Sequence, residues 1–200
     1  NKQITATYSG DENYVRKSSA PYPVGLDVVG ETAVFDTASK KVEPSSIVVG
    51  ESAKISFVVS PDNPAATLPI TGKVRVDYEE NTLCIATLTA VTDKPMSAQG
   101  ECLLTFNEVD DISFTLVYEG NDIYDGEITQ GLILDVNQAD TLISLIANWS
   151  TPTVIGQSMP VEITVVPQFP GKGIPTGNFV IRDLAKPEDF CEGTLNSLGK

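Results

Sequence analysis

Histidine is absent from this chain of 200 residues. Its absence removes the usual general base of hydrolases, the nucleophile–histidine pairs of serine and cysteine enzymes, and a frequent ligand of zinc and iron. The sequence also lacks the glycine-rich loops of P-loop and Rossmann proteins, which cradle phosphates. Its uncharged apolar runs are far too short to span a bilayer. We therefore expect a protein that is not an enzyme and does not insert into a membrane.

Basic residues are scarce: 13 Lys and Arg stand against 27 Asp and Glu, which gives a net charge of −14. A surface this acidic repels the phosphates of nucleic acids and the heads of anionic lipids. Nucleic acid is therefore not an expected partner. The hydrophobic fraction of 41% is nevertheless sufficient to build packed cores.

The sequence contains an internal repeat, because four landmarks return in the same order roughly 105 to 110 residues later. The landmarks and their copies are residues 8–14 (YSGDENY) and 118–124 (YEGNDIY), 48–52 (VVGES) and 154–158 (VIGQS), the Thr-Gly pairs at 71–72 and 176–177, and Cys84 and Cys191. We therefore divide the chain into the closing strands of one unit (1–29), a complete unit (30–136) and the first part of a third (137–200).

Apolar and polar residues alternate within residues 30–136, and a period of two predicts strands rather than helices. The clearest inward-facing runs are Ala53, Ile55, Phe57 and Val59; Val74, Val76 and Tyr78; and Ile112, Phe114, Leu116 and Tyr118. Turn-forming residues separate these runs. About seven short strands in a hundred residues predict an all-β fold of immunoglobulin-like sandwiches with Greek-key connections.

Residues 4–14 (ITATYSGDENY), the two VxGxS-like segments and the two Thr-Gly pairs resemble the bacterial immunoglobulin-like repeat family, which occurs in tandem in large surface and secreted proteins. The resemblance runs the length of the chain, and residues 4–14 are its most specific part. It implies a spacer or adhesive role at a cell surface or in an extracellular polymer. The middle copy departs from the signature, since residues 121–123 (NDI) replace residues 11–13 (DEN).

Tyr8 and Tyr118 occupy the same position in the two copies of this signature, and Gly10 and Gly120 follow two residues later. We expect each tyrosine to bury its ring while its hydroxyl holds a neighbouring loop. The glycines are expected to supply backbone angles that side chains forbid. Trp149, the single tryptophan, is expected to pack between the sheets of the third unit.

Three cysteines in an acidic chain without histidine suggest an oxidising compartment. Cys84 and Cys102 lie in consecutive strands with the same inward phase, so we predict a disulfide between them; two buried free thiols are the alternative. This pair differs from the bridge between the sheets of antibody domains and resembles a disulfide-bearing branch of the bacterial repeats. Cys191 copies Cys84, and the copy of Cys102 falls beyond residue 200. We therefore expect Cys191 to be unpaired or to pair outside the chain.

Acidic residues gather near the inferred junctions, with Asp11 and Glu12 at the first and Asp122 and Asp125 at the second. Carboxylate oxygens at a junction can hold calcium and stiffen it. The sequence lacks a D-x-D-x-D loop, and solvated surface charge is the alternative. No other cofactor is expected.

These patterns predict a structural module of an extracellular or cell-surface protein, such as a stalk, a fibre or an adhesin shaft. Its expected partners are neighbouring repeats of the same or an identical chain. The simpler arrangement is a longer chain of which this sequence is a piece, and the alternative is that one subunit's N-terminal strands complete another's last unit. The alternatives are a glycan- or protein-binding adhesion module and an accessory domain of a secreted hydrolase. A glycan-binding module needs an exposed aromatic platform, for which the candidates are Tyr22, Tyr78, Tyr124 and Phe190.

Overall fold

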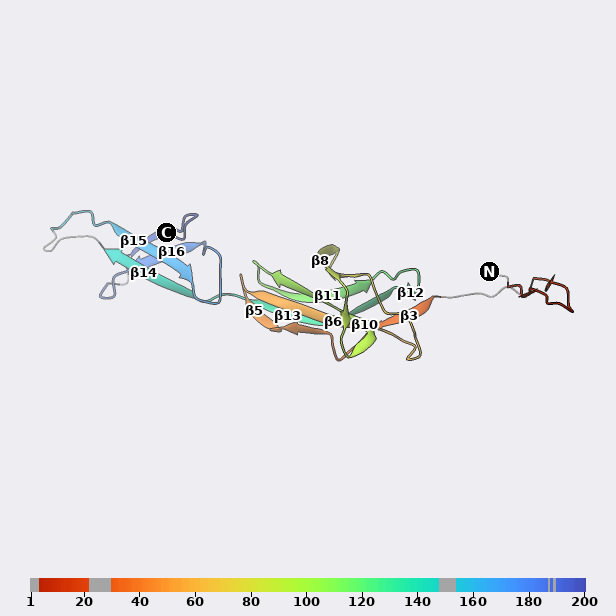
Figure 1. Cartoon of the computed structure of the whole chain (residues 1–200). Coiled ribbons are helices and arrows are strands. Elements are labelled where there is room, and N and C mark those ends of the chain that lie inside the picture. The colour runs from red at the N-terminus through yellow and green to blue at the C-terminus, as the bar shows by residue number, and fades with distance from the viewer. Residues whose placement is uncertain (1–3, 22–29, 148–153, 187, 189) are drawn as a thin grey trace.

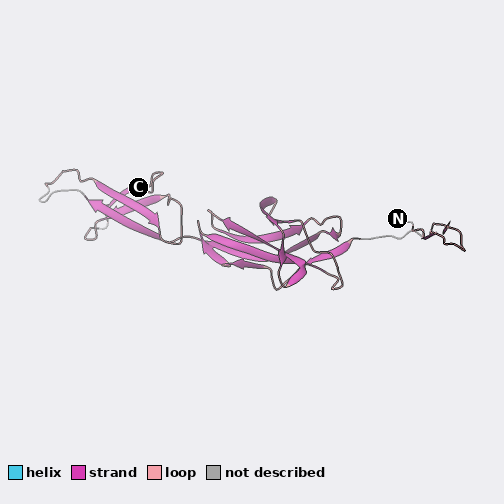
Figure 2. Cartoon of the chain, viewed as in Figure 1, coloured by secondary structure: helices cyan, strands magenta, loops and turns pink. Residues whose placement is uncertain are grey.

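The computed structural model describes residues 4–21, 30–147, 154–186, 188 and 190–200. The regular secondary structure assigned among these residues consists of strands alone (Figure 2). No helix among them is long and apolar enough to cross a membrane. We refer to three parts of the chain: the N-terminal hairpin (residues 4–21), the middle sandwich (30–137) and the C-terminal part (described residues from 138 onward) (Figure 1). Trp149 and Tyr22 lie outside the described residues.

The first sheet of the middle sandwich has six strands in the order β12-β3-β6-β10-β9, with β4 also paired to β6. Their bounds are β3 Glu31–Phe35, β4 Lys41–Glu43, β6 Ser52–Pro61, β9 Thr89–Val91, β10 Lys94–Thr105 and β12 Tyr124–Asp125. All these pairs are antiparallel except β12 with β3, which is parallel.

The second sheet has five strands in the order β5-β13-β11-β7-β8. Their bounds are β5 Ser46–Val48, β7 Lys73–Tyr78, β8 Asn81–Thr87, β11 Asp110–Tyr118 and β13 Glu127–Asn137. The pair β5–β13 is parallel, and the other pairs are antiparallel. The short strand β5 therefore runs beside β13, the last strand of the middle sandwich, in the same direction.

The core lies between these two sheets, because the apolar side chains of each alternating run face the other sheet. The predicted inward residues of β6, Ala53, Ile55, Phe57 and Val59, are at most 1% exposed. The predicted inward residues of β7 and β11 are buried to the same extent, namely Val74, Val76, Ile112, Phe114, Leu116 and Tyr118. Tyr78, at the end of β7, is the exception, because it is half-buried and packs against the core. Complete burial of one large apolar side chain contributes about 1.5–3 kcal/mol. These runs therefore define which face of each strand lies inside.

The middle sandwich contains eleven strand segments, β3 to β13, rather than the predicted seven or so. Part of the excess arises in residues 31–48, where β3 and β4 pair in the six-stranded sheet and β5 pairs in the five-stranded sheet. The chain changes sheets at Pro44, whose nitrogen has no hydrogen to donate to a strand pair. The short segments β9 and β12 account for the remainder.

The two outer parts are built from hairpins. The N-terminal hairpin pairs β1 (Thr7–Tyr8) with β2 (Lys17–Ser18). The C-terminal part has two separate antiparallel pairs, β14 (Thr141–Ala147) with β15 (Val161–Pro167), and β16 (Asn178–Arg182) with β17 (Phe190–Thr194). Among the described residues, these pairs form three two-stranded sheets.

Candidate functional site

A tyrosine loop closes one end of the middle sandwich. The Tyr118 hydroxyl donates a hydrogen bond to the carbonyl oxygen of Thr71 at 2.9 Å. The Asn121 side-chain amide donates to the same oxygen at 3.2 Å and to the Tyr118 hydroxyl at 3.2 Å. The Tyr124 hydroxyl donates to the carbonyl oxygen of Leu68. Three side chains of one loop therefore hold the connection between β6 and β7.

The N-terminal hairpin contains the same loop with a different polar partner. Asp11 Oδ1 accepts from the amides of Asn13 (2.8 Å) and Tyr14 (2.9 Å), as Asn121 Oδ1 does from the two corresponding amides. The Tyr8 hydroxyl, however, donates to Asp11 Oδ2 at 2.5 Å. This bond lowers the pKa of Asp11 and raises the pKa of Tyr8. The Tyr8 hydroxyl therefore bonds within its own loop, whereas the Tyr118 hydroxyl bonds to the separate segment before β7.

The glycine of each loop adopts a left-handed backbone conformation, with φ of 84° at Gly10 and 81° at Gly120. A Cβ built on Gly120 would lie 2.6 Å from the carbonyl oxygen of Tyr124, closer than real Cβ contacts come. Both the backbone angle and the available space therefore require glycine at this position.

The expected burial of the signature tyrosine is correct for one copy and wrong for the other. Tyr118 is 1% exposed, whereas Tyr8 is 48% exposed. The difference has a physical cause. The Tyr118 side chain packs beside residues 68–72 of its own sandwich and bonds to the Thr71 carbonyl. Tyr8 has no corresponding segment to pack against among the described residues, and its hydroxyl bonds to Asp11.

The candidates for an aromatic glycan platform are scattered, and the two that the structure describes pack in or against the core. Tyr124 is 1% exposed and belongs to the core. Tyr78 is half-buried, and its hydroxyl donates to Asp110 Oδ2 at 2.5 Å, which raises the pKa of Tyr78 to about 12. Tyr22 and the side chain of Phe190 lie outside the described residues.

Cys84 and Cys102 form a disulfide, with their Cα atoms 6.3 Å apart. Cys84 lies on β8 of the five-stranded sheet and Cys102 on β10 of the six-stranded sheet. The bridge therefore joins the two sheets, and the expectation that it would differ from an inter-sheet bridge is wrong. The two strands are also not consecutive, because β9 comes between them. Both cysteines point inward from their strands. Because the two sheets enclose the same core, their sulfurs meet between the sheets.

Cys191 is a free, exposed cysteine on β17. Its position matches that of Cys84 in detail: Cys84 is paired with Val76 across β8–β7, and Cys191 with Ile181 across β17–β16. The β16–β17 hairpin thus has the register of the β7–β8 hairpin, at the spacing that the sequence repeat predicts.

A close contact joins the middle sandwich to the C-terminal part. The Lys172 amide donates to the carbonyl oxygen of Val49 at 3.1 Å. Gly50, with φ of 83°, faces Lys172 so closely that a Cβ there would lie 2.6 Å from the Lys172 Cβ and 2.8 Å from its backbone nitrogen. Beside this contact, Gly171 packs against Ala139, where an added Cβ would lie 2.4 Å from the Ala139 side chain. Gly50 belongs to the repeat landmark VVGES, whereas Lys172 stands in a G-K-G loop segment that carries no pairing signal in the sequence.

The four acidic residues expected near the junctions all lie in the described part of the chain. Within the part of the chain that the structure describes, no group of three or more Asp, Glu, Cys or His side chains is placed to hold a metal ion. Asp11 binds its own loop, and the Asp125 carboxylate lies against Gly30, where an added Cβ would be 2.6 Å from Oδ1. Glu12 and Asp122 are exposed. The calcium site proposed for Asp11, Glu12, Asp122 and Asp125 therefore stays a prediction.

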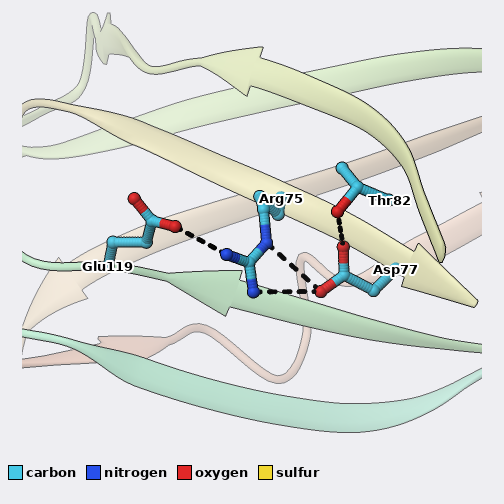
Figure 3. Close-up of polar contacts among 4 residues, drawn as sticks. All are labelled: Arg75, Asp77, Thr82 and Glu119. Atoms are coloured by element: carbon cyan, nitrogen blue, oxygen red, sulfur yellow. Dashed lines mark hydrogen bonds and ion pairs between the residues drawn. The ribbon is translucent and has the colours of Figure 1, made fainter. Parts of the chain in front are cut away.

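A polar cluster lies on the outer face of the five-stranded sheet (Figure 3). Arg75 donates to Glu119 Oε1 at 2.7 Å and, through two nitrogens, to Asp77 Oδ2 at 3.2 and 3.3 Å. Thr82 Oγ1 donates to the other Asp77 oxygen at 2.7 Å. Each group in this cluster has a polar partner from a neighbouring strand or loop, so the cluster acts to connect β7 with β8 and the end of β11.

Comparison of the chain with protein-family models, with curated proteins and with solved structures finds no significant match.

Proposed function

We propose that this chain is a structural spacer segment of an extracellular or cell-surface repeat protein, made of tandem immunoglobulin-like Greek-key units and without catalysis. The N-terminal hairpin belongs to one unit, the middle sandwich is a second, and the C-terminal part belongs to a third. Such an array acts as a stalk, fibre or adhesin shaft in which each unit contacts its neighbours.

The observation that carries this proposal is the contact between the middle sandwich and the C-terminal part. A backbone hydrogen bond from Lys172 to Val49, with Gly50 packed against Lys172, is a direct connection between two bodies that each have their own sheets. Figure 1 shows β14 and β15 beyond the end of the sandwich that carries β5 and β13. A spacer needs this kind of end-to-end contact, because a free linker would let the units fold back on each other.

Matching geometry in the three parts supports the idea of repeated units. The tyrosine loops share a left-handed glycine and the same amide-to-side-chain bonds. The Gly50 and Gly156 turns have φ of 83° and 84°, and the glycines of the two Thr-Gly pairs have φ of 121° and 116°. The disulfide supports an oxidising, extracellular setting, since such bonds are rare in reducing compartments.

Two glycine variants test whether the junction fixes the units. Gly50→Ala and Gly156→Ala impose the same backbone strain, because their φ values differ by a single degree. A Cβ meets Lys172 at Gly50, whereas nothing lies within 4 Å at Gly156. We expect Gly50→Ala alone to remove the hydrogen-exchange protection of the Lys172 amide. Equal protection in both variants would contradict a fixed junction.

Small-angle scattering of the 200-residue chain tests the spacer shape. A compact protein of this length has a radius of gyration of about 16 Å. We expect a clearly larger value and a pair-distance distribution with the long tail of a rod. A value near that of a compact globule would refute the proposed function.

A further inference from the structure

One edge of the five-stranded sheet is open and carries no charge. β8 pairs with β7 on one side, and no strand of the described residues pairs with its other side. Its sequence, Asn81–Thr87 (NTLCIAT), includes neither a charged residue nor a proline, although 20% of the chain's residues are charged. An edge strand of this kind offers its free N–H and C=O groups to a further strand.

Other open edges of the middle sandwich carry the protection that β8 lacks. β5, β9 and β12 have three residues or fewer. β4 carries Lys41 and Glu43, and the unpaired side of β10 carries Glu101. Along β13, the Lys40 ammonium donates to the Thr129 hydroxyl at 2.6 Å. Length, charge or a lysine therefore protects these edges, and β8 has none of the three.

The free backbone groups of β8 are those of Ile85 and Thr87. The Leu88 amide donates to the carbonyl oxygen of Gly72 at 3.0 Å, so the backbone groups of Leu88 point toward the β7 side. Successive residues of a strand direct their backbone groups to opposite edges. The N–H and C=O of Thr87 and Ile85 therefore point to the open edge, within the part of β8 (84–87) whose ladder with β7 is regular.

The side chain at the centre of this edge is apolar and exposed. Ile85 is 57% exposed on the outer face of the sheet, opposite Arg75 of β7. The guanidinium of Arg75 already forms ion pairs with Asp77 and Glu119. The outer face at this edge therefore presents an apolar side chain beside a charge that is already neutralised.

The β16–β17 hairpin, which has the register of the β7–β8 hairpin, carries a charge at the position of Ile85. The pair Val180↔Glu192 corresponds to the pair Arg75↔Ile85. Glu192 is exposed. Charged side chains on edge strands oppose pairing with another chain. The corresponding strand of the C-terminal part thus has the protecting charge that β8 lacks.

We propose that the middle sandwich pairs side by side with a second copy of this chain through β8. The two β8 strands run antiparallel with Ile85 opposite its counterpart, so that each of these residues donates its N–H to the other's C=O. The direction follows from charge, because Glu79 and Glu80 lie at one end of β8 and Lys73 lies beside the other end. Antiparallel pairing brings the acidic end of each copy toward the lysine of the other, whereas parallel pairing would place like charges side by side.

The contact uses the same edge of both copies, so the interface is closed and association stops at the dimer. The Cys84–Cys102 disulfide ties this edge strand to the core before it pairs, which lowers the cost of ordering it. The proposal goes beyond the proposed function and does not depend on it, because it concerns a contact between chains rather than a contact along the chain.

Sedimentation velocity of the 200-residue chain, from micromolar to millimolar concentration, tests the proposal. All samples carry Cys191→Ser, so that disulfide-linked dimers cannot form. We expect a monomer–dimer equilibrium without larger species. Ile85→Glu should weaken dimerisation about tenfold, because two carboxylates then lie opposite each other across the interface. The variant should still fold, since the new carboxylate lies opposite Arg75 within its own sheet.

Ile128→Glu is the matched control. Ile128 is 65% exposed on the same face and belongs to the same cross-strand row, which runs through Val117 and Arg75 to Ile85. It lies on β13, away from the β8 edge, so this variant should dimerise like the parent. Hydrogen exchange gives an independent measurement, because the Ile85 amide should gain protection in the dimer.

Three results would each overturn the proposal: a chain that stays monomeric at every concentration, assembly that continues beyond the dimer, or equal weakening by Ile85→Glu and Ile128→Glu. A dimer in which the Ile85 amide exchanges as fast as in the monomer would overturn it too. None of these results affects the shape of the monomer in solution, on which the test of the proposed function rests.

Discussion

Reduction of the Cys84–Cys102 disulfide should lower the stability of the middle sandwich by about 3 kcal/mol, the loop-closure entropy of a short loop. The bridge closes a loop of 18 residues, which includes β9 and the crossing between the two sheets. We expect the native contacts to stay the same on reduction, because Cys102 lies in the packed core, where it is only 3% exposed. The effect therefore comes mainly from the greater freedom of the unfolded chain.

The loss is large against the 5–15 kcal/mol that typically separates folded and unfolded domains. A change of 1 kcal/mol shifts the melting temperature of a 100-residue domain by about 4–8 °C, so we expect a decrease of roughly 12–24 °C. Calorimetry with and without a reductant measures it, and urea unfolding of a Cys84→Ala/Cys102→Ala double variant provides an independent value. Cys191→Ser is the control and should leave the transition of the middle sandwich unchanged. Melting that is insensitive to the reductant would refute the reasoning.

Three further results are expected. Tyr118→Phe should lower the free energy of unfolding in urea by about 1 kcal/mol, because it removes a partly buried hydrogen bond. Tyr8→Phe should leave that free energy unchanged, because Tyr8 is half exposed. Equal effects of the two variants would contradict the different roles of the two hydroxyls. Bonding to Asp110 raises the pKa of Tyr78 to about 12, so its stabilising contribution is complete below about pH 10 and is lost as the pH rises through about 12. An alkaline absorbance titration should show an ionisation near pH 12 that Tyr78→Phe removes, and a titration that is complete near pH 10 would contradict this. Excess calcium should leave the melting temperature equal to that in chelator, because the described carboxylates form no metal group; a rise would show a site that we have not found.

Alternation along the strands was sufficient to identify the core. Ile55, Phe57, Val74 and Val76 were assigned to the inside from their period alone, and all are at most 1% exposed. The same local signal could not tell which sheet a strand joins. Cys84 and Cys102 share the inward phase, and their strands lie in opposite sheets because both sheets face the same core.

Burial of the signature tyrosines depended on distant residues, and so the sequence around them could not predict it. Tyr8 and Tyr118 each stand two residues before a left-handed glycine, in loops of nearly the same geometry. What differs is the segment before β7, which lies more than forty residues away from Tyr118 in the chain and packs on it. The junction at Lys172 escaped prediction for a similar reason, since a backbone amide forms its bond and no side-chain pattern marks it.

The parallel pairing of β5 with β13 determines how the middle sandwich responds to tension. The chain enters before β3 and leaves after β13, so a pull on the two ends drags β5 and β13 in opposite directions along their shared axis. Their bonds, such as Val49 N–H to the Asn137 carbonyl at 2.9 Å and Asp135 N–H to the Ser45 carbonyl at 3.1 Å, are loaded in shear and must rupture together rather than one after another. If the sandwich does yield, the Cys84–Cys102 bridge keeps its 18-residue loop closed. About 60 Å of contour length then stays out of reach of the applied force.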